Sequence, residues 1–163
     1  MTPVADLLAR LASGGRAGTD AALVLGLLLE RETVTRPPAD DGGPRLLLPA
    51  EWRQRRLDPA ETQQVVDALL DHVRGTPVPD PTAVWALGKS LEPRIVPPLV
   101  DLLHRVLADG ALDDLAQQAF GAVVVAAPGS GYEADVLAVA WAAAKQAPGD
   151  VAEVARDYLL AQP

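Results

Sequence analysis

The sequence predicts an all-helical fold, from its composition and from the spacing of its apolar residues. Hydrophobic residues make up 49% of the 163 residues, whereas aromatic residues make up only 4%, so Ala, Leu and Val must fill the core. Ala and Leu favour helices, while β-rich folds usually recruit β-branched and aromatic residues. Apolar residues also recur at helical spacing, as in Val65, Val66, Leu69, Leu70 and Val73. We therefore expect one all-α domain over residues 1–163, with about eight or nine helices.

Residues 1–48 divide into a helix pair and a loop. Pro3 opens an apolar stripe that ends at Ser13-Gly14-Gly15, and Thr19 or Asp20 is placed to cap a second helix. Residues 1–34 are therefore expected to form an N-terminal helix pair. Residues 35–48 are rich in Pro and Gly, which predicts an exposed loop.

From residue 49 onward the sequence repeats itself. Leu57-Asp58-Pro59 recurs as Leu91-Glu92-Pro93, and Ala86-Leu87-Gly88 recurs as Ala119-Phe120-Gly121. The two landmarks are independent, yet the intervals between their copies agree to within one position, which indicates a duplicated helix pair. A single pair cannot bury its apolar stripe, so neighbouring pairs are expected to stack.

Residues 82–107 resemble a HEAT repeat. In that family an A helix ending in Ala-Leu-Gly leads through a short turn to a B helix, here opening with Val96-Pro97-Pro98-Leu99. The resemblance is weaker over 112–146 and faint over 49–74. It implies a short right-handed α-solenoid of HEAT-like helix pairs over residues 49–162. It also implies protein binding, since most such repeats bind proteins and few carry chemistry.

The net charge of −8 is confined to the repeat region. Residues 1–60 contain eight basic and eight acidic residues, whereas residues 61–163 contain six basic and fourteen acidic residues. An acidic surface repels phosphate backbones and attracts cationic partners. We therefore expect a protein partner with a basic surface, and no nucleic acid. The alternative is that the acidic surface only keeps the protein soluble.

The repeat period also places three aspartates at equivalent positions, Asp67, Asp101 and Asp135. If the period is structural, they lie at one height on successive B helices, which line the concave face in such arrays. With Asp71 and Arg105, they form the predicted protein-binding surface. Equal weight goes to the alternative that these aspartates cap or pair locally with neighbouring helices.

The sequence offers no catalytic, cofactor-binding or metal-binding site. It has no cysteine, and its two histidines, His72 and His104, each lie near one aspartate, which is half of a metal site. Ser130 lacks the setting of a hydrolase nucleophile and is expected to cap a helix, with Glu133 completing a capping box. No glycine cluster has the spacing of a phosphate-binding loop.

Three tryptophans, Trp52, Trp85 and Trp141, are expected to fill gaps between small alanine side chains rather than to serve as exposed anchors.

The favoured function is thus a non-catalytic protein-binding scaffold or adaptor. A narrower alternative is an immunity or antitoxin-type protein that inhibits a basic enzyme, because such partners associate by electrostatic steering. A less favoured alternative is a HEAT-like DNA glycosylase, which needs a basic groove that this sequence does not predict. The first residues lack a secretory pattern and no stretch is long enough for a membrane span, so a cytoplasmic location is expected. The oligomeric state is left open.

Overall fold

The computed structural model describes residues 3–33 and 48–163, with side chains described except for residues 31–33. Within these residues the chain is helical and contains no strand, which confirms the predicted all-α fold class. The predicted loop over residues 35–48 lies outside the described residues, apart from Leu48. The α-helices are α1 (Pro3–Ser13), α2 (Gly15–Thr33), α3 (Pro59–Gly75), α4 (Pro81–Gly88), α5 (Val96–Val106), α6 (Asp113–Ala126), α7 (Glu133–Gln146) and α8 (Val151–Leu160). Short 3-10 turns are η1 (Ala50–Trp52), η2 (Pro93–Ile95) and η3 (Gly110–Leu112).

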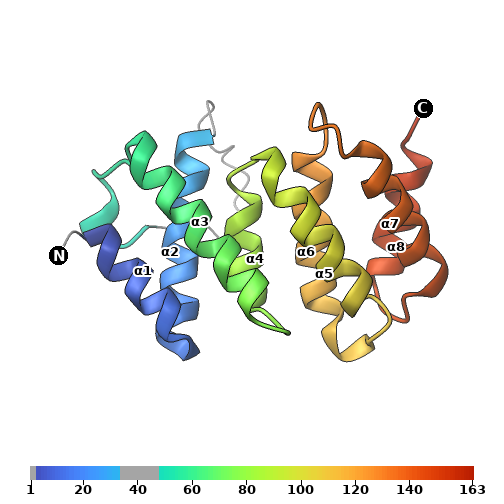
Figure 1. Cartoon of the computed structure of the whole chain (residues 1–163), viewed down its shortest axis with the longest axis horizontal. Helices are drawn as coiled ribbons and strands as arrows, with labels where there is room; N and C mark the ends of the chain where they lie inside the picture. The colour runs from blue at the N-terminus through green and yellow to red at the C-terminus, as the bar shows by residue number, and fades with distance from the viewer. Residues whose placement is uncertain (1–2, 34–47) are drawn as a thin grey trace.

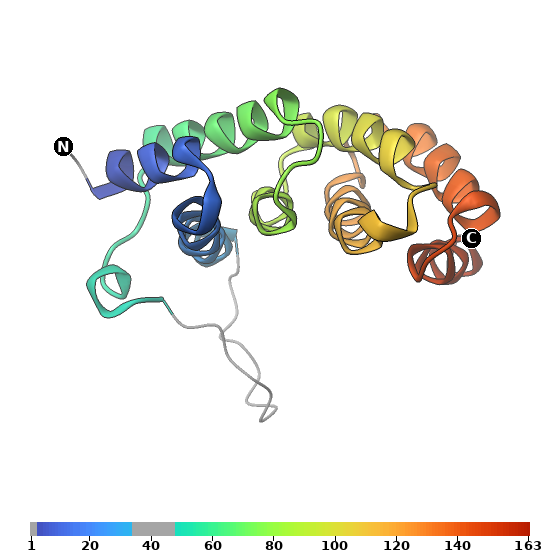
Figure 2. The ribbon, with the colours of Figure 1, turned by 90° about the horizontal axis from the view of Figure 1, so that it is seen from below.

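The helices are arranged in two rows (Figure 1). The outer row contains α1, α3, α5 and α7, and the inner row contains α2, α4, α6 and α8; Figure 2 shows that the outer row arches over the inner one. Each outer helix packs on the inner helix that follows it in sequence, and neighbours within a row also pack together. The first helix pair contributes α1 to the outer row and α2 to the inner row. The two-row packing therefore begins at Pro3, although the repeat in the sequence begins at residue 49.

The segment that resembles a HEAT repeat spans both rows. Its first helix, α4, packs on α2, α3 and α6, and its second helix, α5, packs on α3, α6 and α7. The turn between them contains Leu91, a non-glycine residue in the left-handed region with φ of 56°. The Leu-acid-Pro landmark precedes a helical element in both copies, before α3 and before η2.

The start of α3 carries a capping box that was not predicted, whereas the polar cap predicted for the second helix is wrong. Asp58 caps α3, because its side chain accepts a hydrogen bond from the Glu61 backbone and the Glu61 side chain accepts one from the Asp58 backbone. The prediction that Thr19 or Asp20 caps the second helix is wrong, since α2 begins at Gly15. Gly14 adopts φ of 71°, so the chain reverses there without a polar cap. Thr19 instead donates its hydroxyl to the Asp80 carboxylate, ahead of α4.

The predicted capping box of Ser130 and Glu133 is also wrong. Helix α7 begins at Glu133 itself, so this residue lies at the first helical position and not the third. Its carboxylate accepts a hydrogen bond from the Gly129 backbone, and the Ser130 hydroxyl accepts one from the Tyr132 backbone. Both side chains therefore stabilise the turn before the helix instead of its first amides.

Glycine and alanine let the inner helices approach closely. A methyl group at Gly26 of α2 would overlap the ring of Trp85 on α4, and one at Gly88 of α4 would lie 2.9 Å from the Ala122 methyl of α6. These contacts leave no space for any side chain at either glycine, because protein interiors are close-packed. At each of these contacts one helix contributes only a glycine, which lets α2, α4 and α6 approach closely.

A matched pair of glycine substitutions tests this packing. We predict that Gly26→Ala lowers the free energy of unfolding by about 1–3 kcal/mol, because the new methyl group forces Trp85 out of its site. Gly121→Ala, on exposed α6 surface with nothing near its added methyl group, should instead raise stability by up to about 1 kcal/mol. Urea unfolding of both variants checks this. Equal effects at the two positions would contradict the close approach.

The last helix is capped from another element. Asp113, the first residue of α6, accepts a hydrogen bond of 3.0 Å from the Val151 backbone at the start of α8, and Gln117 donates to its second oxygen. The hydrogen bond from Val151, followed by that from Gln117 and one from the Asp150 backbone, lowers the pKa of Asp113 despite partial burial. This carboxylate therefore joins α6 to α8 in its charged form.

The stability contributed by Asp113 should depend on pH. Its pKa is lowered in the folded state, so the contribution is present above the unfolded value near 3.8 and is lost as pH falls through the folded value. We predict that Asp113→Ala costs about 1 kcal/mol at pH 7, and that Asp114→Ala, in the same helical turn, costs clearly less. Urea unfolding at pH 7 and at strongly acidic pH should show the gap between the variants narrowing in acid. A gap that stays constant would contradict the cap.

Candidate protein-binding surface

All five residues of the predicted surface lie exposed on the outer row. Asp67 and Asp71 lie on α3, Asp101 and Arg105 on α5, and Asp135 on α7. The three aspartates that the predicted period links, Asp67, Asp101 and Asp135, therefore lie on successive helices of one row. The expected concave location is wrong, because the row that carries these residues is the outer one in Figure 2. The outer helices form the longer arc, so their free faces point away from the hollow side.

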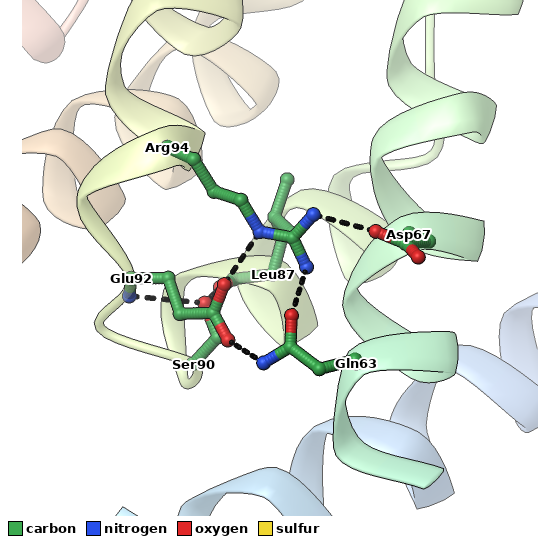
Figure 3. A network of polar contacts seen from close by, with 6 residues as sticks. All are labelled: Gln63, Asp67, Leu87, Ser90, Glu92 and Arg94. Atoms are coloured by element: carbon green, nitrogen blue, oxygen red, sulfur yellow. Dashed lines mark hydrogen bonds and ion pairs between the residues drawn. The ribbon is translucent and has the colours of Figure 1, made fainter. Parts of the chain in front are cut away.

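Asp67 is engaged within the molecule (Figure 3). The guanidinium of Arg94, at the start of η2, lies 2.5 Å from the Asp67 carboxylate and 2.6 Å from that of Glu92. Gln63, one turn before Asp67 on α3, accepts from Arg94 and donates to Glu92, both at 2.9 Å. The network joins α3 to the turn before α5. Asp67 therefore pairs locally with a neighbouring element, as the alternative prediction stated.

The same network changes the pKa of Arg94, the residue at its centre. The hydrogen bond to Glu92, and then the one to Asp67, raises the pKa of Arg94, against the effect of partial desolvation. Ser90 orders the other end of the turn: its hydroxyl donates to the Leu87 carbonyl and accepts from the Glu92 backbone. Two carboxylates and one amide side chain thus hold a single cation.

Replacing Arg94 should cost more than replacing a neighbouring exposed aspartate. We predict that Arg94→Ala lowers the free energy of unfolding by about 1 kcal/mol, since exposed pairs contribute up to about that amount and here several act on one cation. Asp71→Ala, one turn after Asp67 on the same helix, should leave stability within about 0.5 kcal/mol of the wild type. Urea unfolding at two salt concentrations checks this, because the Arg94 effect should shrink at high salt. A larger loss from Asp71→Ala would contradict the assignment.

Asp101 and Arg105 line an open groove between α3 and α5. The groove has a volume of about 410 Å³ and is lined by Val73 and Arg74 of α3 and by Pro97, Pro98, Asp101 and Arg105 of α5. Arg105 is held there by a hydrogen bond of 3.2 Å to the Pro77 carbonyl, in the turn after α3. The structure thus brings two of the five predicted residues into one recess.

The groove carries charges that are free to meet a partner. Arg74 and Asp101 are both exposed. Neither has a hydrogen-bond or ion-pair partner among the described residues. The proline rings and Val73 add an apolar floor between these charges. The recess therefore suits a polypeptide segment with an apolar side chain flanked by charged ones, a combination typical of protein interfaces.

Sequence reasoning missed Arg74, Pro97 and Pro98 as members of the surface. The interval from Arg74 to Arg105 does not match the repeat period, so the spacing gave no signal for their proximity. Asp71 and Asp135 lie outside the groove lining, on α3 and α7 respectively, and their carboxylates have no partner within the described part of the chain. They border the groove region on helices that both pack on α5.

The histidines do not assemble a metal site. His72 accepts a hydrogen bond of 3.2 Å from the Asp80 backbone, which stabilises the turn between α3 and α4. His104 is exposed on α5. Within residues 3–33 and 48–163, no group of three His, Cys, Asp or Glu side chains is placed to hold a metal ion.

Comparisons with protein-family models, with curated proteins and with solved structures gave no match to this sequence. None of the described helices combines the length and the apolar character that crossing a membrane requires.

Proposed function

We propose that this chain is a non-catalytic scaffold of HEAT-like helix pairs that binds a partner protein through the outer faces of α3, α5 and α7. The groove lined by Arg74, Asp101 and Arg105 is the observation that carries the proposal, because it offers around an apolar floor two charges, Arg74 and Asp101, that have no partner among the described residues. A rigid two-row array supports such a role, since binding residues are most precisely placed on helices.

The proposed partner has a predominantly basic surface. Asp71 and Asp135 lie exposed on the helices on either side of α5, and Asp101 lies between them in the groove. These three carboxylates have no partner in the part of the chain that the structure describes, so they favour lysines and arginines on the partner and speed its association at low salt. Arg74 and Arg105 would then meet an acidic residue within that basic surface and so add specificity.

A charge reversal in the groove tests the proposal. We predict that Asp101→Lys lowers affinity at least about tenfold for a protein recovered by affinity purification, because like charges would face each other. Asp20→Lys makes the same change of charge on exposed α2 surface and should alter affinity less than about twofold. Calorimetry or biolayer interferometry on both variants, with circular dichroism as a folding check, measures this.

Two results would overturn this function. Affinity for the partner that is unchanged by Asp101→Lys would remove the groove from the interface. Retention of DNA at moderate salt without any protein partner would favour the glycosylase alternative, since phosphate binding needs a basic surface. If the recovered partner is a basic enzyme, loss of its activity at a one-to-one ratio would support the narrower immunity-protein function.

A further inference from the structure

A second surface lies on α7, on the side opposite the core. Helix α7 packs on α5, α6 and α8 through Val136, Val139, Ala140 and Ala143, all buried. Its opposite side exposes Ala134, Ala138, Trp141 and Lys145, whose spacing of four, three and four positions places them along one stripe. We call this stripe the α7 face.

Trp141 is the most unexpected residue of the α7 face. Its side chain is 65% exposed, whereas Trp52 is only 7% exposed and Trp85 packs partly buried between α2 and α4. The prediction that all three tryptophans fill gaps in the core is therefore wrong for Trp141. A tryptophan on a helix surface leaves a large apolar area in water, and at interfaces such residues contribute most of the binding energy.

The α7 face is complementary to a second copy of itself. When two such helices pair in antiparallel orientation, with the axis between residues 139 and 140, Trp141 of each copy faces Ala138 of the other. A large side chain then lies over a small one twice, by symmetry. The same register places Lys145 of each copy against Ala134 of the other copy. The two neighbours of Ala134 in the sequence, Glu133 and Asp135, are acidic.

Charge also selects the antiparallel orientation. Glu133 and Asp135 lie in the first turn of α7 and Lys145 lies in its last turn. A parallel copy would place like charges together at both ends, whereas an antiparallel copy places opposite charges together at both ends. Size and charge therefore favour the same arrangement.

We propose that the α7 face is a homodimer interface in which two copies of this chain pair through antiparallel α7 helices. The contact uses one helix face from each copy, so it falls below the standard interface of about 1,600 Å² and gives a weak, reversible dimer. No residue of α7 lines the groove, so the dimer can be tested separately from the groove, although Asp135 belongs both to this interface and to the proposed partner surface.

Sedimentation of the full chain across roughly 10–500 µM tests the dimer. The wild type should move from monomer to dimer across this range. Trp141→Ala should raise the dissociation constant at least about thirtyfold, since truncation of a central tryptophan commonly costs at least about 2 kcal/mol. Trp52 is buried and therefore unsuitable as a control, whereas Leu160→Ala, at an 84% exposed position on α8, should change association little. Circular dichroism confirms that each variant folds.

A charge-swap mixture tests the antiparallel register separately. Lys145→Glu alone and Asp135→Lys alone should each weaken self-association at least about tenfold, because like charges then face each other. Mixing the two variants should restore association, since position 145 of each copy in the mixed dimer again faces a charge of opposite sign at position 135 of the other copy. A wild type that stays monomeric throughout the range, or a dimer insensitive to Trp141→Ala, would overturn the proposal. A mixture no stronger than its components would overturn it as well.

Discussion

The close approach of α2, α4 and α6 is the constraint on which the rest of the structure depends. Gly26 lies against the Trp85 ring and Gly88 against Ala122, so at each contact one of the two helices contributes no side chain. Lys89 lies over the Trp85 ring as well and pairs with Glu30 of α2 at 3.2 Å. With few aromatic residues to fill gaps, close helix contact is how a core of Ala, Leu and Val reaches normal packing density.

The inner row determines what the outer row can present. Each outer helix packs on the inner helix that follows it. The distances between α3, α5 and α7 therefore depend on the distances between α4, α6 and α8. The network around Arg94 then fixes the turn before α5 relative to α3. The helices that bound the groove, α3 and α5, are consequently held both by the inner row and by the Arg94 network. This keeps the charged residues of the groove in a defined geometry.

Much of the fold could be predicted from the sequence because helical periodicity is a local property. The stripe of Val65, Val66, Leu69, Leu70 and Val73 is buried as expected, and the aspartates at 34-residue spacing lie on successive helices of one row. Local capping was less predictable. Ser130 and Glu133 have the spacing of a capping box, but the helix starts later because both side chains bond within the preceding turn.

The candidate site was predictable only in part, because a groove is made by residues that the sequence keeps apart. Asp101 and Arg105 share one helix and were both predicted to belong to the surface, whereas Arg74 joins them only through the packing of α3 on α5. Asp67 has the same sequence signal as Asp101, yet its carboxylate is held by Arg94 while that of Asp101 has no such partner among the described residues. Trp141 shows the same limit, since its periodic position does not reveal whether a neighbour covers it.

Nuclear magnetic resonance of the glycine protons at the inner row tests the central claim most directly. Close packing predicts that the chemical shifts of the Gly26 Hα protons are displaced from ordinary values by the Trp85 ring current and that these protons show nuclear Overhauser effects to that ring. It also predicts an effect between the Gly88 Hα protons and the Ala122 methyl group. Glycine shifts at ordinary values, with neither effect present, would contradict the close approach of these helices and the geometry of the outer row that depends on it.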